Sequence, residues 1–250
     1  PQVSLKSLPA TVGVSTGTPS EPGWTSLFNG KDLTGWELHP SNFPADVQDG
    51  AIRIRGSRSR SESGNISYRG SGSLRPQWTD FELICTVKTE NKGNSGINIH
   101  SSPANDGTNI ANGLEVDVWN DTKPSKSGSL YRFGAKPDSS ITDGEWFQLK
   151  TRIVGKHIQT WLKKPEENEW VLAVDWTQPE NWEPPAGSPG QKLGSGTISL
   201  QSSPPLNGVV WFKEVKFRSF DPVTASQPES SLILGRWVRT NMDRPGEAYL

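Results

Sequence analysis

Residues 94–119 contain two runs in which apolar and polar side chains alternate strictly, Gly96-Ile97-Asn98-Ile99-His100 and Leu114-Glu115-Val116-Asp117-Val118-Trp119. Successive side chains of a β-strand point to opposite faces, so the two runs predict neighbouring strands with one apolar and one polar face. The predicted apolar face holds Ile97, Ile99, Leu114, Val116 and Val118. The predicted polar face holds Asn98, His100, Glu115, Asp117 and Trp119. Such a polar face suits either a sugar-binding surface or a sheet that faces solvent.

Similar strand-like runs recur along the chain about every ten residues, and none of the sequence has helical periodicity. The predicted strands span 51–55, 81–87, 146–154, 157–163, 170–176, 196–201 and 209–220. Gly155-Lys156 predicts a two-residue hairpin turn, and alternation in the two flanking strands separates the apolar side chains from the outward ones, Lys150, Arg152, Gln159 and Trp161. Residues 56–73, rich in Ser, Gly and Arg, predict a long loop. Many short strands separated by turns predict an all-β, two-sheet antiparallel jelly-roll sandwich.

The composition supports this class and excludes others. The 250-residue chain is 32% hydrophobic, yet it has 25 glycines, 20 prolines and 11 tryptophans, which is typical of a turn-rich β domain with large aromatic side chains. The net charge of −1 gives no reason to expect nucleic acid or an anionic membrane as a partner. No apolar run reaches the roughly eighteen residues that a membrane-spanning helix needs.

Both ends of the chain extend beyond the predicted domain. We expect an N-terminal tail at 1–22, a jelly-roll domain at 23–220 and a C-terminal extension at 221–250. The two short, nearly uncharged runs of the first tail suit the addition of a strand to a sheet edge. The candidate assembly residues are Val3, Leu5, Leu8, Val12 and Val14. If the tail completes the sheet of the next copy, the head-to-tail contact gives rings or filaments, so a homo-oligomer or polymer is predicted.

The start of the sequence and the single cysteine bear on location and redox chemistry. The first residue is Pro1 and the one methionine is Met242, so we expect a secreted, extracellular protein whose signal peptide has been removed, with a fragment boundary as the alternative. Cys85 excludes an internal disulfide. It shares a predicted strand face with Phe81, Leu83 and Val87 and is predicted to be a small buried hydrophobe rather than a reactive thiol.

Several short motifs occur in an order that resembles one known family. They are Leu27-Phe28-Asn29-Gly30-Lys31-Asp32-Leu33-Thr34-Gly35-Trp36, Asp80-Phe81-Glu82-Leu83, Gly93-Asn94-Ser95-Gly96-Ile97, Gly113-Leu114-Glu115-Val116-Asp117-Val118, Gly128-Ser129-Leu130-Tyr131 and Gly144-Glu145-Trp146. Together they make residues 24–220 similar to the 3-keto-disaccharide hydrolase domain family. The resemblance implies a concanavalin-like jelly roll, usually secreted, that acts on oxidised glycosides. It also implies that the strand with Glu115 and Asp117 lies on the concave face.

The chain departs from the family pattern at three places near the expected groove. Ser202-Ser203-Pro204 stands where the family often has Asp-His-Gly, and His100 stands where it often has an arginine. Lys163-Lys164-Pro165 and an acidic insertion replace the usual Asn-Gly hairpin. These departures leave the fold intact and favour a domain that is kept for its shape.

The candidate catalytic residues are Glu115, Asp117 and His100. Glycosidases use carboxyl pairs about 5–5.5 Å or 6.5–9.5 Å apart, and two residues separated by one on a strand have Cα atoms about 6.5–7 Å apart. A 3-keto sugar offers a second route, in which His100 or a carboxylate removes the proton beside the ketone. The alternative is that the two carboxylates pair with Lys150 or Arg152 across the sheet.

The predicted groove also has residues that would bind the sugar. The candidate substrate-binding residues are Asn98, Trp119, Lys150, Arg152, Trp161 and Gln201. Tryptophan faces suit sugar rings, although tryptophans of sandwiches more often fill cores or rims. No cofactor is predicted, while a divalent cation on His100, Glu115 and Asp117 is the weaker possibility.

Two functions follow from different parts of the chain. The tails favour an extracellular structural subunit that assembles into filaments or a surface layer, and this hypothesis is preferred by a small margin. The alternative is a hydrolase or lyase that acts on 3-keto-glycosides, or a carbohydrate-binding module.

Overall fold

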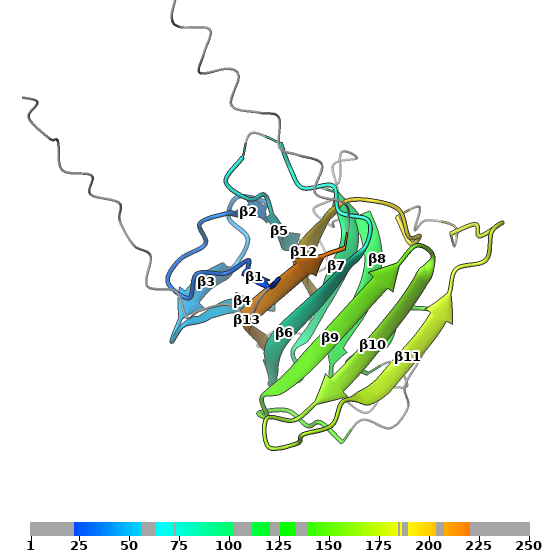
Figure 1. Ribbon diagram of the computed structural model, residues 1–250. Coiled ribbons are helices and arrows are strands. Elements are labelled where there is room, and N and C mark those ends of the chain that lie inside the picture. The colour runs from blue at the N-terminus through cyan, green and yellow to red at the C-terminus, as the bar shows by residue number, and fades with distance from the viewer. Residues whose placement is uncertain are drawn as a thin grey trace, which may run out of the picture. The chain divides into compact units, whose positions relative to one another are not determined.

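The computed structural model describes residues 23–56, 64–72, 74–102, 112–120, 126–133, 140–184, 186, 190–203 and 208–220. In this part of the chain every regular element is a β-strand (Figure 1). The strands are β1 (Thr25–Ser26), β2 (Trp36–His39), β3 (Ala45–Gln48), β4 (Ala51–Arg55), β5 (Gly64–Tyr68), β6 (Phe81–Glu90), β7 (Asn94–Ser102), β8 (Asn112–Trp119), β9 (Phe147–Val154), β10 (His157–Lys163), β11 (Val171–Thr177), β12 (Thr197–Ser203) and β13 (Val209–Ser219).

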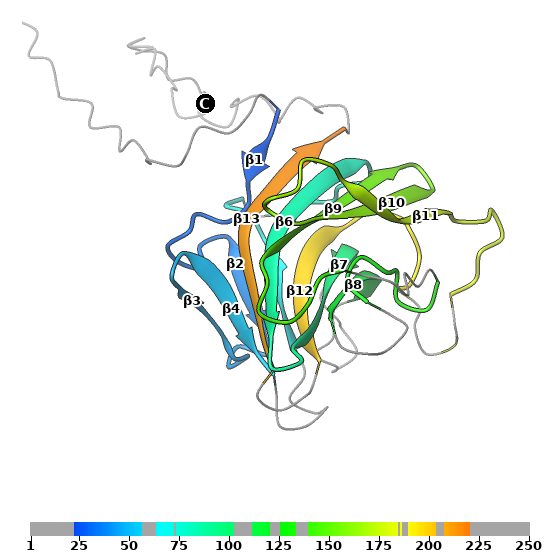
Figure 2. The same cartoon turned by 90° about the horizontal axis from the view of Figure 1, so that it is seen from below.

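The strands form two antiparallel sheets that lie one on the other (Figure 2). The eight-stranded sheet has the order β11-β10-β9-β6-β13-β4-β3, with β1 beside β13. The five-stranded sheet has the order β2-β5-β12-β7-β8. Strands far apart in the sequence are therefore neighbours in both sheets. The prediction of an all-β jelly-roll sandwich is confirmed.

The inner faces of the two sheets form one hydrophobic core. The apolar residues predicted for β7 and β8, from Ile97 to Val118, are all fully buried in it. Phe81, Phe147 and Phe212 of the eight-stranded sheet are the largest fully buried side chains. The core thus takes one side of each strand and leaves the other side as an outer face.

The hairpin of β9 and β10 confirms the predicted alternation in detail. Val154 pairs with His157 across the two-residue turn. Leu149 and Ile153 are fully buried, while Lys150 and Arg152 lie on the outer face. Cys85 of β6 is likewise buried, and this burial raises the pKa of its thiol, as expected for an inert side chain.

The prediction of one long loop at 56–73 is wrong in its second half, because β5 lies there. Its one fully buried apolar residue, Ile66, is too little for an alternation pattern to detect. The strand nevertheless pairs with β2 on one side and β12 on the other. Gly64 fits because a Cβ atom there would lie 2.4 Å from the carbonyl oxygen of His39. Pairing with distant strands therefore outweighs the loop-like composition.

Several predictions concern residues outside the described part of the chain. The assembly residues Val3, Leu5, Leu8, Val12 and Val14 fall there, as does the whole extension 221–250. Assembly through the tails and the proposed domain bounds therefore stay predictions. In the described part of the chain, no helix has the length and apolar character needed to cross a membrane.

We expect Gly64→Ala to lower the free energy of unfolding by about 1–3 kcal/mol, because the added methyl group meets backbone that cannot move aside freely. Gly194→Ala is the matched control, since nothing lies within 4 Å of a Cβ atom at that position. Urea denaturation of both variants measures the difference. Equal losses of stability in the two variants would contradict the close packing of β5 against β2.

Candidate functional site

Two rows of polar residues cross the outer face of the five-stranded sheet. One row, in the order of the strands from β2 to β8, consists of Glu37, Ser67, Ser199, Asn98 and Glu115. The second row consists of His39, Asn65, Gln201, Gly96 and Asp117. The apolar row between them faces the core. Glu115, Asp117, Asn98 and Gln201 are thus brought together, as the sequence predicted.

The Glu115 side chain can lie across the neighbouring strand because the residue under it there is a glycine, which has no side chain. The Glu115 side chain starts on β8 and passes over Gly96 of β7, where a Cβ atom would lie only 2.3 Å from Glu115 Oε1. On the far side, Gln201 Nε2 of β12 donates a hydrogen bond to the same oxygen. Three strands therefore fix the position of one carboxyl group.

The environment of Glu115 favours its neutral form. Burial and the nearby Asp117 carboxylate raise its pKa from 4.5 to about 8, while the hydrogen bond from Gln201 acts in the opposite direction. Asp117 is itself only 4% exposed. Repulsion by the Asp117 carboxylate therefore helps to keep the Glu115 carboxyl protonated at neutral pH. Two carboxyl groups in different protonation states are suited to the roles of acid and base.

Asn98 adds a hydrogen-bond donor beside this pair. It lies opposite Glu115 on one side and opposite Ser199 on the other, and only 3% of its surface is exposed. Its Nδ2 atom is buried and has no hydrogen-bond partner among the residues that the structure describes. An unsatisfied buried donor is unfavourable by about 1–3 kcal/mol, so this amide is suited to bind an oxygen of a ligand.

The floor next to Asn98 is held by a chain of hydrogen bonds between short side chains. The Ser199 hydroxyl lies 2.7 Å from the hydroxyls of both Ser67 and Ser101. Ser67 also donates to Asn65 Oδ1 at 2.8 Å. These buried groups satisfy one another and make the surface under a bound ligand rigid.

Tyr131 joins the site through a segment that covers the edge of β8. The Tyr131 amide donates to the carbonyl oxygen of Glu115 at 3.0 Å, and the next residue back, Leu130, pairs with Val116. Tyr131 therefore shares the outer face with Glu115, and it is 38% exposed. Sequence analysis missed it as a site residue, although the motif 128–131 was part of the family resemblance and could have indicated it.

His100 does not lie in the site, so its prediction as a catalytic base or metal ligand is wrong. A β-bulge follows Ile99, and His100 has a φ of 49°. The bulge turns its ring towards Phe81, with ring centroids 5.6 Å apart. Nε2 lies 2.8 Å from the Thr79 carbonyl oxygen, and the Gly194 amide donates to Nδ1 at 3.0 Å. Both ring nitrogens are occupied by backbone groups away from Glu115.

Lys150, Arg152 and Trp161 do not lie in the site either. Their strands, β9 and β10, pair with β6 in the eight-stranded sheet. Their side chains lie on the outer face of that sheet, on the opposite side of the sandwich from Glu115. The predicted groove that combines the two sets is wrong, and so is the alternative in which these cations pair with the carboxylates. Alternation correctly showed that the side chains point outwards, but not to which sheet they belong.

Trp119 lies two residues beyond Asp117, near the end of β8, and is partly buried. Its backbone amide donates a hydrogen bond to Ser127 Oγ at 2.9 Å. The alternation of β8 places it on the same face as Asp117, at the rim of the site.

No group of three or more His, Cys, Asp or Glu side chains that could hold a metal ion occurs among the residues the structure describes. The displacement of His100 removes one member of the ligand set that the sequence suggested. A divalent cation at Glu115 and Asp117 remains a prediction.

Comparisons with known proteins agree with the fold. A family model described as "3-keto-alpha-glucoside-1,2-lyase-like domain" matches residues 23–218. No curated protein matches the sequence. A crystal structure from Parabacteroides distasonis ATCC 8503, titled as a "putative glycosyl hydrolase", has a TM-score of 0.63 and 21% identity, and covers 80% of this chain and 94% of its own. A second structure so titled, from the same organism, has a TM-score of 0.58 and 22% identity over 79% and 99% of the two chains.

The pH dependence of stability tests the environment of Glu115. The pKa of Glu115 is higher in the folded state than in the unfolded chain, so the contribution of this carboxyl to the free energy of unfolding is fully present below pH 4.5. The contribution falls as the unfolded chain ionises and levels off above about pH 8. The free energy of unfolding of the protein minus that of Glu115→Gln should therefore decrease by the order of a few kcal/mol across this window. Denaturant titrations at several pH values measure the difference.

Glu90→Gln is the control, because hydrogen bonds from Lys88 and then Trp211 lower the pKa of Glu90. The stabilising effect of the Glu90 carboxylate should be present at neutral pH and disappear only on acidification below about pH 4.5. Parallel pH curves for the protein and Glu115→Gln would show that the Glu115 carboxyl is ordinary.

Proposed function

Because the chain belongs to the family of 3-keto-alpha-glucoside-1,2-lyase-like domains, we propose that it cleaves 3-keto-glycosides on the outer face of the five-stranded sheet. The observation that carries the proposal is the Glu115 carboxyl, which has a pKa of about 8 beside a second carboxylate. The family match and the fold support a glycosyl hydrolase-like or carbohydrate-binding jelly-roll domain. We propose more specifically that the bond is cleaved by elimination.

The chemistry of the substrate fits this pair of carboxyl groups. A ketone at C3 acidifies the proton on C2, and the Asp117 carboxylate takes this proton. The electrons of the C2–H bond form a C1=C2 double bond as the C1–O bond breaks. Protonated Glu115 donates its proton to the departing glycosidic oxygen, which leaves as an alcohol. In each turnover Asp117 gains one proton and Glu115 loses one, and no water is consumed.

Asn98 completes the arrangement. Removal of the C2 proton moves negative charge onto the C3 oxygen, and a positioned donor stabilises that charge as it develops. The buried Nδ2 atom of Asn98, opposite Glu115 in the sheet, supplies such a donor. Tyr131 and Trp119 lie on the same face and are suited to contact the sugar at the rim.

The departures from the family pattern leave this group of residues in place. His100 packs against Phe81, away from the carboxyl pair. The side chains of Ser202 and Ser203 lie outside the described part of the structure. The hypothesis that the sequence favours, a secreted subunit that polymerises through 1–22, rests on residues that the structure does not describe. It stays a prediction, as does the extracellular location.

Glu115→Gln and Asp117→Asn should each lower turnover of a methyl 3-keto-α-glucoside by about 100-fold or more, because each removes one proton-transfer group and methoxide is a poor leaving group unless it is protonated. Released methanol measures the rate, and ultraviolet absorbance of the unsaturated keto sugar distinguishes elimination from hydrolysis. Glu90→Gln, on the outer face of the other sheet, should keep full activity. Activity that survives both substitutions would remove the proposal, and a saturated sugar product would replace elimination by hydrolysis.

Gln201→Leu tests the positioning of Glu115 through a pH profile. The lost hydrogen bond favours the charged carboxylate, so its removal raises the pKa of Glu115 further. The alkaline limb of kcat/KM should move from about pH 8 to higher pH, by about one unit for a bond to a charged group. Gln159→Leu, which loses a hydrogen bond to Asp175 on the other sheet, should leave the limb unchanged. A limb that shifts to lower pH would contradict this assignment.

A further inference from the structure

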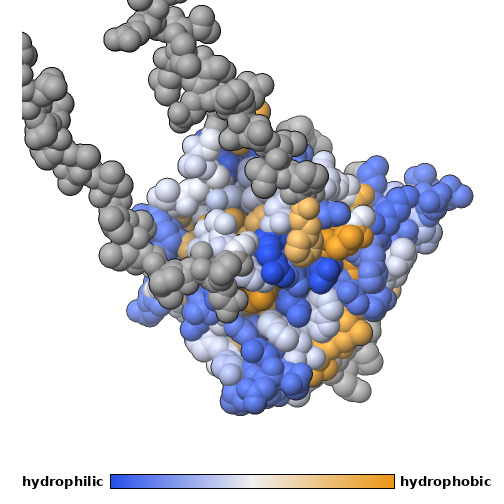
Figure 3. All heavy atoms as spheres, viewed as in Figure 1, coloured by the Kyte–Doolittle hydropathy of each residue, from blue (hydrophilic) through white to orange (hydrophobic). Residues whose placement is uncertain are grey.

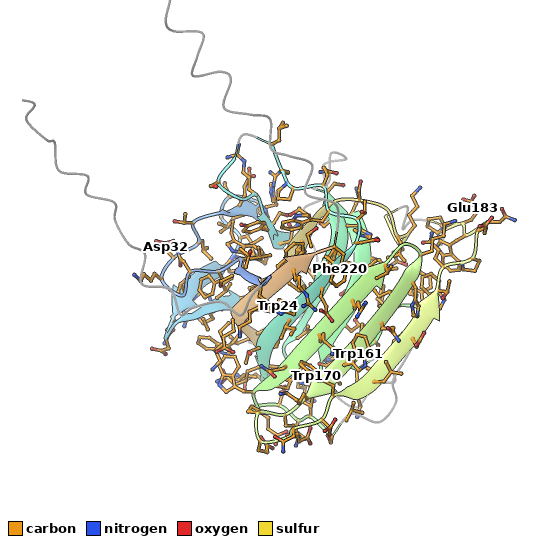
Figure 4. All side chains as sticks on the ribbon, in the orientation of Figure 1. Trp24, Asp32, Trp161, Trp170, Glu183 and Phe220 are labelled. Atoms are coloured by element: carbon orange, nitrogen blue, oxygen red, sulfur yellow. The ribbon has the colours of Figure 1, made fainter. Side chains whose placement is uncertain are left out.

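The outer face of the eight-stranded sheet carries an unusual succession of aromatic and cationic side chains. Figure 1 views this face from the front, and Figure 4 labels Trp161 and Trp170 near each other over β9 and β10. Trp24 and Phe220 lie further along the same face (Figure 4). The residues of this surface, here called the cationic ladder, are Lys88, Trp146, Lys150, Trp161, Lys163, Trp170, Trp211 and Lys213.

Lys150 lies at the centre of one half of the ladder. Its Nζ atom is 4.3 Å from the ring centroid of Trp161 and 4.5 Å from that of Trp170. Lys163 Nζ lies 5.2 Å from the Trp170 ring. Ammonium groups at this distance from indole rings are attracted by the ring electrons, so the contacts hold the lysine side chains against the sheet.

The other half of the ladder is built in the same way. Lys213 Nζ lies 4.1 Å from the centroid of the Trp146 ring, and Lys88 Nζ lies 5.2 Å from both Trp146 and Trp211. Trp211 also donates to Glu90 at 3.0 Å, and Lys88 forms an ion pair with that carboxylate. At this end of the ladder the charge of Lys88 is therefore offset by that of Glu90.

The two halves are continuous across four strands. Lys213 of β13 faces Thr86 of β6, which faces Gln148 of β9, which faces Lys163 of β10. In the adjacent outward row, Lys150 faces Trp161 directly. A bound chain that crosses the strands would meet a cation, polar side chains and a second cation in succession.

Cations outnumber carboxylates in the middle of the ladder, where Thr86 donates a hydrogen bond to Glu214 at 2.8 Å. In the part of the chain that the structure describes, no carboxylate forms an ion pair with Lys150, Lys163 or Lys213. Burial holds the pKa of Lys150 below its ordinary value, and repulsion from Arg152 and Lys163 adds to this, whereas Glu82 opposes it. An anion placed between these lysines would relieve the repulsion.

The same surface leaves apolar area in contact with water. Hydrophilic and hydrophobic residues are mixed on the side of the molecule seen in Figure 3. Val171 and Leu172 at the β11 edge are 49% and 46% exposed. Trp161 and Trp170 are only partly buried, and neither indole N–H donates a hydrogen bond to another described residue. Partly exposed indoles with available N–H groups are suited to pack on sugar rings and to bind their hydroxyls.

We propose that the cationic ladder binds an acidic polysaccharide, with its carboxylate or sulfate groups between Lys150, Lys163 and Lys213 and its sugar rings against Trp161 and Trp170. Complementarity of charge favours an anionic over a neutral polymer. The chain's net charge of −1 supplies no long-range attraction for any polyanion, so the recognition depends on the local charge of the ladder. The ladder lies on the opposite side of the sandwich from Glu115, and the inference goes beyond the proposed cleavage reaction.

Affinity electrophoresis and isothermal titration calorimetry of the full chain test the proposal, with polygalacturonate as the anionic probe. We expect binding that weakens with added salt, and that Lys150→Met and Lys163→Met each reduce about tenfold. Trp161→Ala should reduce it as well. Lys156→Met is the matched control, because Lys156 lies in the turn of the same hairpin, outside the ladder.

The outcomes separate the partners. Dextran, which is neutral, and an oligothymidylate strand are the comparison probes, and polygalacturonate should bind at least tenfold more tightly than either. Tighter binding of oligothymidylate would overturn the proposal in favour of nucleic acid. Equal binding of dextran, no binding of polygalacturonate, or ladder variants that behave like Lys156→Met would also overturn it. Turnover of the keto-glycoside should be unchanged in the ladder variants, so failure here and failure of the proposed reaction are distinguishable.

Discussion

The packing of two apolar strand faces against each other determines where chemistry can occur in this domain. Phe81, Leu83, Cys85 and Val87 of β6 are fully buried on one side of the core, and Ile97 lies with them from the other sheet. Because side chains alternate along a strand, each buried residue leaves its neighbours on an outer face. The sandwich therefore has two outer faces that point in opposite directions. A carboxyl pair occupies one and a row of cations occupies the other, so each face can act without the other.

Local patterns in the sequence were enough to predict the strands and the direction of most side chains. The hairpin 147–163 has the expected turn, buried residues and outward residues, because these features depend on neighbours in the sequence. The pairing of strands depends on contacts between distant segments. Lys150 and Trp161 were therefore predicted correctly as outward-facing, yet assigned to the wrong sheet. Because strand pairing was not known, residues from two separate surfaces were assigned to one predicted groove.

The remaining errors come from backbone features that a side-chain pattern does not contain. One extra residue at the bulge after Ile99 reverses the direction of His100, since a shift of one residue exchanges the two faces of a strand. Strand β5 was missed for another reason. It has one buried apolar residue, Ile66, and its polar residues Asn65 and Ser67 satisfy each other and β12 in the outer face. A strand in the middle of a polar face reads as a loop.

The carboxyl pair is arranged in a way that does not favour folding. Glu115 is held neutral beside Asp117, and the buried Asn98 Nδ2 atom has no hydrogen-bond partner in the described part of the chain. Each is unfavourable, and each would be relieved by a small change such as glutamine at 115 or serine at 98. Gly96 and Gln201 nevertheless place the Glu115 carboxyl across three strands. A domain kept only for its shape would gain stability by losing these groups. Their presence together on a rigid floor is therefore better explained by a ligand whose oxygens and protons they handle.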